Sequence, residues 1–189
     1  FVYIATLSGG SIQFTTAMLF AVAFLATFLI GGVTGIFLGA SGADIYFHDT
    51  YFVLAHFHYT FVPIAVIAVF AGVYYWFPKI FGRFMNEFWG KVHFWGTAVP
   101  FNFVFIPLFF TGASGDHRRI YNYDNFPDLA VPLLQNMRII ATVSLLIMLA
   151  FQVIFFINFF YSMFRGKKAD KNPWQANTLE WIAPSPPPH

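Results

Sequence analysis

The sequence predicts an all-α protein, a polytopic transmembrane helix bundle with four membrane-spanning helices, and three observations support this. Hydrophobic residues make up 58% of the chain and charged residues only 10%, whereas soluble domains carry about 25% charged residues. Four apolar stretches each reach the roughly 20 residues that a helix needs to cross a bilayer. These stretches are continuously apolar, without the alternation typical of strands in a membrane barrel, which favours helices.

The spans are expected at about residues 12–40, 50–77, 92–111 and 129–164. The first span has no formal charge, the second contains no charged residue apart from its histidines, and the fourth is interrupted by Arg138. We interpret 1–189 as one domain, in which residues 165–189 form a tail outside the membrane. No charged segment precedes the apolar residues at Phe1, so we expect no signal peptide and a chain that is part of a longer one.

The composition disfavours several kinds of site. The chain has no cysteine, which excludes disulfides and thiolate metal sites, so that any metal must be bound by histidine or carboxylate. The cations lie in short loops and form no basic aromatic face, and nucleic acid is therefore not expected as a partner. No glycine-rich phosphate loop, Gly-x-Ser-x-Gly or His-Glu-x-x-His motif is present.

The distribution of basic residues predicts the orientation in the membrane. The connection between the second and third spans and the tail after the fourth lie on one side and are rich in Lys and Arg, whereas the opposite side carries mainly aspartates. Basic loops face the cytoplasm or the mitochondrial matrix. We therefore expect an integral protein of a bacterial plasma membrane or mitochondrial inner membrane, with its C-terminal tail on the cytoplasmic or matrix side.

Three features of the spans bear on packing. Gly31, Gly35 and Gly39 are four residues apart, which either lets helices approach closely or reflects the ordinary tolerance of glycine in membrane helices. Pro63 is expected to kink the second span, because proline cannot donate to the helical ladder. His93, at the inner end of the third span, is interpreted as a polar residue at the membrane interface.

The stretch "HDTYFVLAHFHY", residues 48–59, contains three histidines at the start of the second span. On a helix, residues two apart point about 200° from each other, so His56 and His58 face opposite sides and cannot easily share one ion. Neutral imidazole is the usual axial ligand of heme iron. One helix placed between two hemes fits this geometry. The alternative is that each histidine is hydrogen-bonded to a neighbouring helix.

His48 and Asp49 directly precede this span. Imidazole with carboxylate suits a divalent cation such as magnesium or manganese. Taken alone, the local chemistry favours a helix-capping aspartate with a solvated histidine beside it over a metal site.

The segment "GDHRRIYNYDNFPD", residues 115–128, is expected on the same outer side. The adjacent Arg118 and Arg119 can bind carboxylates through bidentate forks, and heme propionates are carboxylates. The alternatives are lipid headgroups, or ion pairs with Asp116 and Asp124.

Taken together, "GGVTGIFL", "HDTYFVLAHFHY", "HRRIYNY" and "NTLEWIAPSPPP" resemble, in the same order, subunit I of the heme-copper terminal oxidases, specifically the cytochrome c oxidase branch. The resemblance covers essentially the whole chain. It implies that the four spans correspond to the C-terminal third of a twelve-helix subunit.

The resemblance also implies roles for single residues. His56 would ligate the high-spin heme where oxygen is reduced, which makes it the catalytic candidate, and His58 would ligate the low-spin heme. His48 and Asp49 would hold magnesium or manganese. The remaining cofactor-binding candidates lie near the heme propionates: Asp44, Arg118 and Arg119.

The implied activity is the reduction of dioxygen to water with electrons from cytochrome c, coupled to proton pumping. The implied cofactors are two hemes, expected to be of the A type, and copper at the oxygen site, whose ligands lie outside this chain. The implied partners are the rest of subunit I, the copper-bearing subunit II, subunit III, cytochrome c and lipid.

Three alternative functions remain open on the sequence. A quinol oxidase of the same superfamily is disfavoured by Asp49, because quinol-using relatives often carry Asn there. A histidine-dependent proton or metal-ion transporter would need acidic residues at mid-membrane, and the spans contain none. A purely structural membrane subunit leaves the cluster of histidines unexplained.

Overall fold

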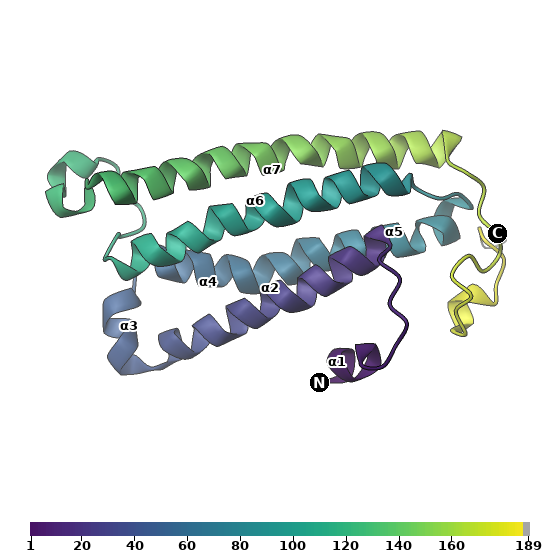
Figure 1. Ribbon diagram of the computed structural model, residues 1–189, viewed down its shortest axis with the longest axis horizontal. Helices are drawn as coiled ribbons and strands as arrows, with labels where there is room; N and C mark the ends of the chain where they lie inside the picture. Colours follow the sequence, from purple (N-terminus) through teal and green to yellow (C-terminus); the bar gives the residue numbers. More distant parts are fainter. Residues whose placement is uncertain (187–189) are drawn as a thin grey trace.

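The computed structural model describes residues 1–186 of the chain, and within them every regular element is helical (Figure 1). Four passes are long and apolar enough to cross a membrane, and they run antiparallel to their neighbours in sequence. The helices are α1 (Val2–Leu7), α2 (Thr16–Gly39), α3 (Ser41–Phe47), α4 (Tyr51–Val62), η1 (Pro63–Ile67), α5 (Ala68–Phe81), α6 (Glu87–Ala113), η2 (Tyr123–Asn125), η3 (Pro127–Leu129), α7 (Pro132–Arg165) and η4 (Leu179–Trp181).

The two ends of the bundle differ. The end that carries α3 and residues 114–131, drawn on the left of Figure 1, is called the loop end below. The opposite end carries the segment after α7 and is called the tail end. At the tail end, helices extend a few residues past the apolar stretches because their limits are set by caps: Gly82 closes α5 with φ 64°, and the Asn86 side chain accepts a hydrogen bond from Trp89 N at the start of α6.

The second pass is continuous but not uniform. Thr50 caps α4 by accepting a hydrogen bond from Phe52 N at 3.2 Å. At Pro63 the α-helical pattern gives way to one π-helical turn, η1, before α5 completes the pass. Proline has no N–H to donate, so the regular ladder is interrupted where the sequence predicts a kink. The irregular turn follows directly after the part of α4 that bears the two histidines.

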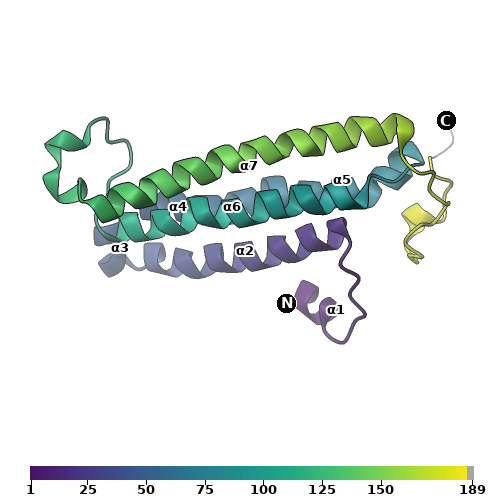
Figure 2. The same ribbon diagram turned by 45° about the horizontal axis from the view of Figure 1, so that its top comes forward.

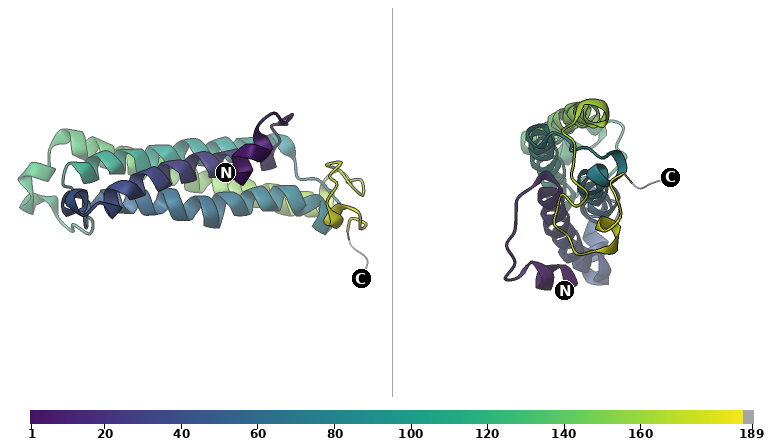
Figure 3. Two further views of the ribbon diagram at one scale, coloured as in Figure 1. Left: turned by 90° about the horizontal axis from the view of Figure 1, so that it is seen from below. Right: turned by 90° about the vertical axis from the view of Figure 1, so that its right-hand side faces the viewer.

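Helix α6 is the most enclosed of the four passes. Half of the residues in its most apolar stretch are buried, whereas the buried share is 17% in α2 and in α7. Figure 2 shows α7 lying along α6, and the end-on view in Figure 3 shows the four passes bundled side by side. Small residues allow this closeness: a Cβ added at Gly96 would overlap the Phe151 ring, and one at Gly112 would overlap the backbone of Phe52. The exposed apolar faces of α2 and α7 are available to lipid or to further protein.

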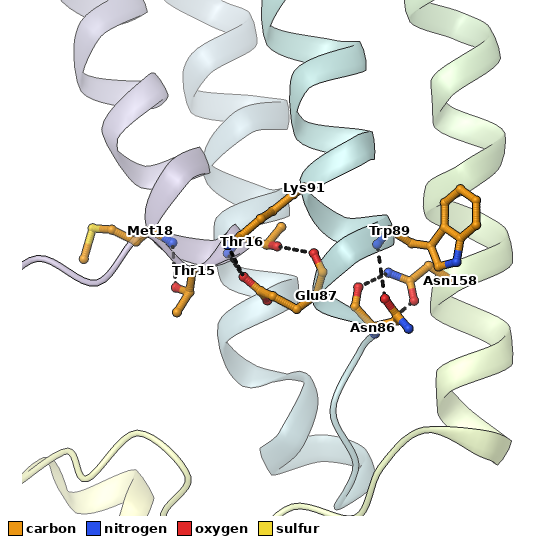
Figure 4. A network of polar contacts seen from close by, with 8 residues as sticks. All are labelled: Thr15, Thr16, Met18, Asn86, Glu87, Trp89, Lys91 and Asn158. Carbon is orange, nitrogen blue, oxygen red and sulfur yellow. Dashed lines mark hydrogen bonds and ion pairs between the residues drawn. The ribbon is translucent and has the colours of Figure 1, made fainter.

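A polar clasp joins three helices at the tail end (Figure 4). Glu87 Oε1 accepts a hydrogen bond from Thr16 N at 2.6 Å, which satisfies one of the free N–H groups at the start of α2. Asn158 of α7 donates to Asn86 O at 3.0 Å and accepts from Asn86 N at 3.1 Å. These contacts fix the starts of α2 and α6 against α7.

The sequence predicts His93 as a polar residue at the membrane interface, and the structure places it among the packed helices α5, α6 and α7. Its side chain is fully buried, with Nδ1 3.2 Å from the Tyr74 hydroxyl and Nε2 3.1 Å from Gln152 Oε1. Gln152 in turn donates to Thr97 Oγ1 at 3.0 Å. A polar ring inside a membrane bundle needs such partners. They come from α5 and α7, so the local sequence around His93 cannot reveal them.

The chain after α7 folds back over the tail end. Trp174 donates to Tyr75 O at 2.9 Å, Trp181 donates to the Tyr75 hydroxyl at 3.1 Å, and Lys79 donates to Ala183 O at 2.7 Å. Trp181 is only 1% exposed. The predicted tail, residues 165–189, is therefore docked on the end of α5 as far as it is described, and its last residues, 187–189, lie outside the described part.

Two adjacent glycines of α2 provide a matched test of the packing. A Cβ at Gly31 would lie 2.6 Å from the backbone oxygen of Tyr59, whereas one at Gly32 would meet nothing within 4 Å. We expect Gly31→Ala to destabilise the bundle by about 1–3 kcal/mol, because the backbone of α4 must move. Gly32→Ala is expected to be neutral or stabilising by up to about 1 kcal/mol through helix propensity.

The measurement is the apparent Tm of each purified variant in the same detergent, followed by intrinsic tryptophan fluorescence. Equal Tm values for the two variants would contradict the close contact between α2 and α4.

Candidate functional site

The candidate site lies on α4, where His56, Phe57 and His58 occupy successive positions within one helical turn. Both histidines are partly buried, and Phe57 between them is 52% exposed and stacks on Phe61 at 5.4 Å between ring centroids. Each imidazole contacts a different neighbouring helix, His56 contacting α2 and His58 contacting α6.

His56 is oriented by α2. Its Nδ1 lies 3.1 Å from the Thr34 hydroxyl, and a Cβ at Gly35 would come within 3.0 Å of His56 Cε1. The single proton of the Thr34 hydroxyl is directed to the carbonyls of Gly31 and Ile30, at 2.9 and 3.0 Å. The hydroxyl oxygen can then accept from His56 Nδ1–H, and in that tautomer the Nε2 lone pair is available.

His58 is oriented by its own helix and by α6. Its Nδ1 lies 2.8 Å from Leu54 O, which can only accept, so Nδ1 carries the proton and Nε2 again keeps its lone pair. The ring stacks on Phe105 of α6 with 4.4 Å between centroids and 18° between planes. His56 thus faces α2 while His58 faces α6, in agreement with the angle that helical spacing predicts.

The two imidazoles have the features of metal-ligating histidines. In such sites the ring nitrogen that does not bind metal donates to a carbonyl or other acceptor, which fixes the tautomer and the orientation of the ring. Both histidines meet this condition through Nδ1. Because the rings lie on different sides of α4, they suit two separate groups and not one shared ion.

A second group of polar residues lies at the loop end, just before α4. His48 Nε2 is 3.3 Å from Asp49 Oδ2, and Arg118 donates through Nε to Asp49 Oδ1 at 2.9 Å. The hydrogen bond and charge of Arg118, with smaller contributions from His48 and Arg119, hold the pKa of Asp49 below its ordinary value. Asp49 is therefore ionised at neutral pH, as a ligand for a hard cation must be.

The predicted pair His48–Asp49 is thus brought together, but it offers only two ligands. No cluster of three or more His, Cys, Asp or Glu with metal-binding geometry occurs in residues 1–186. A magnesium or manganese ion there would need further ligands from water or from another segment. Both residues are more than half exposed, so such ligands have access.

Two other predicted residues are less engaged. Asp44 lies in the first turn of α3, and Arg119 follows Arg118 with φ 71°. Neither side chain forms a hydrogen bond or ion pair within the described residues. The sequence left open that the paired arginines bind Asp116 or Asp124. In the structure Arg118 instead pairs with Asp49.

The sequence reasoning missed a buried ion pair beside this group. Asp116 is 0% exposed and its Oδ2 lies 2.7 Å from Arg138 Nη1, while Tyr123 donates to its other oxygen at 3.2 Å. The signal that could have found it is the lone Arg138 in an otherwise apolar span, because such a residue needs an acidic partner.

Comparisons with known proteins identify the family of the chain. A family model described as Cytochrome C and Quinol oxidase polypeptide I matches residues 1–147. The chain is 44% identical over 187 residues to a curated protein of Synechocystis sp. named cytochrome c oxidase subunit 1, covering 99% of this chain and 33% of that protein. It is 37% identical over 186 residues to the alternative cytochrome c oxidase subunit 1 of Bradyrhizobium diazoefficiens, covering 98% of this chain and 31% of that protein.

Among solved structures, a heme-copper terminal oxidase dimer matches 80% of this chain and 27% of its own, with a TM-score of 0.68 and 20% sequence identity. At that identity the likeness shows the fold. The chain spans about a third of the length of the curated relatives that it matches. The four apolar passes and these relatives make it an integral membrane protein, and the chain belongs to the family of cytochrome c and quinol oxidase polypeptide I.

Proposed function

We propose that this chain works as part of a terminal respiratory oxidase that reduces dioxygen to water with electrons from cytochrome c and pumps protons. The observation that carries the proposal is the pair of imidazoles on α4. Both have the Nδ1 proton engaged and Nε2 available, and they face α2 and α6 respectively. One helix can in this way ligate two separate hemes.

In this proposal, His56 would hold the iron of the high-spin heme through Nε2, and His58 would hold that of the low-spin heme through Nε2. When bound, the hemes, expected to be of the A type, and a copper whose ligands lie outside this chain supply the electron transfer and oxygen chemistry. The chain itself supplies the imidazole ligands, fixes their orientation through Thr34 and Leu54 O, and sets their separation by placing them two residues apart on one rigid helix.

The loop end would hold the charged parts of the cofactors. Arg118 and Arg119 would bind the heme propionates and stabilise their ionised form, and Asp44 would lie beside the propionates of the high-spin heme. His48 and Asp49 would contribute to a magnesium or manganese site. The partners in this proposal are the rest of subunit I, a copper-bearing subunit II, subunit III, cytochrome c and lipid, in a bacterial plasma membrane or mitochondrial inner membrane with the tail on the cytoplasmic or matrix side.

A quinol oxidase is the second candidate, because the description of the matching family includes both donors. The curated relatives named above are cytochrome c oxidases, and this supports the cytochrome c branch. We expect the purified complex to oxidise reduced cytochrome c faster than ubiquinol at equal concentrations. Faster oxidation of quinol would replace the proposed donor, and a complex without heme would favour the transporter alternative.

Substitution of each histidine tests the assignment of the two hemes. We expect His56→Ala to abolish the high-spin heme signal and carbon monoxide binding while part of the low-spin heme remains, and His58→Ala to abolish the low-spin signal. His117→Ala, in the exposed loop, is the control and should leave both signals unchanged. The measurement is the reduced-minus-oxidised spectrum of the purified complex, with and without carbon monoxide. Loss of only the low-spin heme in His56→Ala would contradict the assignment.

The hydrogen bond from His56 to Thr34 yields a finer prediction. Thr34→Val keeps the shape of the side chain but removes the acceptor for Nδ1–H, so the imidazole loses its orientation. We expect oxygen consumption to fall about 10- to 100-fold, the usual range for such supporting hydrogen bonds, with a shift in the iron–histidine stretching band in resonance Raman spectra. Thr142→Val, which removes a similar intrahelical bond on exposed α7, should change neither quantity.

A further inference from the structure

The ion pair between Asp116 and Arg138 is the most enclosed charged group in the described part of the chain. Asp116 has a side-chain exposure of 0% and Arg138 of 17%. Arg138 also donates to Leu129 O at 3.1 Å, and its guanidinium lies 3.9 Å from the centre of the Tyr123 ring. Burial above all, with a hydrogen bond to Tyr51 and the negative charge of Asp116, raises the pKa of Tyr123, so its hydroxyl stays protonated and donates to Asp116.

Stability alone does not account for this pair. Removing two charges from water is costly, and a well-packed apolar pair of similar volume is often as stabilising or more so. Removing only one partner is strongly unfavourable, because a buried charge is left without compensation. Such a pair can also hold together the segments that carry it, here the loop of Asp116 and helix α7.

The backbone of Asp116 is hydrogen-bonded to the start of α4. Its carbonyl accepts a hydrogen bond from Tyr51 N, at the start of α4, at 3.0 Å, and two residues later Arg118 N donates to Asp49 O at 3.0 Å. Thr50 and His117 form an antiparallel bridge between these two bonds. The segment that carries the paired arginines is thus joined directly to the first residues of the histidine-bearing helix.

The side chains continue the same connection. Arg118 reaches Asp49, while Asp116 reaches Arg138 on α7. Residues 49–51 and 116–118 therefore form one unit whose attachment to the rest of the bundle includes the buried ion pair with α7. Arg138 belongs to α7, a 34-residue helix that lies along α6 (Figure 2) and anchors this unit.

We propose that Asp116 and Arg138 are positioning residues that hold Arg118 and Arg119 in place beside the heme propionates. The inference rests on the proposed function, since it assumes that hemes are bound at His56 and His58. Through this pair, helix α7, which itself carries none of the proposed heme ligands, influences the potential of the low-spin heme.

The test uses the complete oxidase complex with Asp116→Asn, Arg138→Gln and the double variant, and Asp124→Asn in the same loop as the control. In Asp116→Asn, Arg138 is left as an unpaired buried cation, the segment shifts, and positive charge is withdrawn from the propionates. We expect the midpoint potential of the low-spin heme to fall, changing the electron equilibrium constant about tenfold, which is about 59 mV for one electron.

This variant separates positioning from direct electrostatics. If Arg118 and Arg119 stayed in place, removing the charge of Asp116 would leave one additional positive charge near the heme, and the potential would rise. A rise, or no change, in Asp116→Asn overturns the inference. In the double variant no buried charge is unpaired but the ion pair is still absent, so we expect a smaller fall in the potential than in Asp116→Asn; Asp124→Asn should leave the potential unchanged.

If the charge variants fail to assemble, a milder variant still tests the inference. Tyr123→Phe removes one hydrogen bond to Asp116 without stranding a charge, and we expect a smaller fall in the potential; an unchanged potential in this variant overturns the inference. Heme content, measured on the same samples, separates the two proposals. An unmodified complex without two hemes contradicts the proposed function, whereas two hemes with the wrong shift in Asp116→Asn contradict only the positioning role.

Discussion

The close approach of α4 to its two neighbours is the constraint on which the rest of the structure depends. A Cβ at Gly31 of α2 would clash with the backbone of Tyr59 in α4. A Cβ at Gly112 of α6 would clash with the backbone of Phe52 at the start of α4. Without a hydrophobic driving force between helices in lipid, such van der Waals contact is a main source of helix association. It also decides which atoms of α2 and α6 come within reach of the histidines.

The orientation of the two imidazoles follows from this packing. Gly35 leaves room for the His56 ring, and Thr34, one residue earlier, supplies the acceptor for its Nδ1. Phe105 of α6 provides the surface on which His58 stacks. Without these neighbours His56 would lose the acceptor that orients its ring, and His58 would keep only its bond to Leu54 O and lose the Phe105 surface.

Polar groups elsewhere in the bundle must each have a hydrogen-bond partner inside the protein, because lipid offers none. Across residues 1–186, no buried side-chain nitrogen or oxygen lacks a hydrogen-bond partner. His93 is satisfied by Tyr74 and Gln152, and Asp116 by Arg138 and Tyr123. These networks join helices that are far apart in the sequence, and they make the loop end and the interior of the bundle specific as well as stable.

The sequence by itself determined the class of the protein, its four spans and the opposite directions of His56 and His58. These depend on the length of apolar runs and on the 3.6-residue period of a helix, both of which are local. The tertiary structure alone decided that His93 is buried, that Arg118 pairs with Asp49, and that Asp116 pairs with Arg138. Each of these contacts joins different helices or loops, and which ones meet is set by close packing between helices, a property that no single stretch of sequence contains.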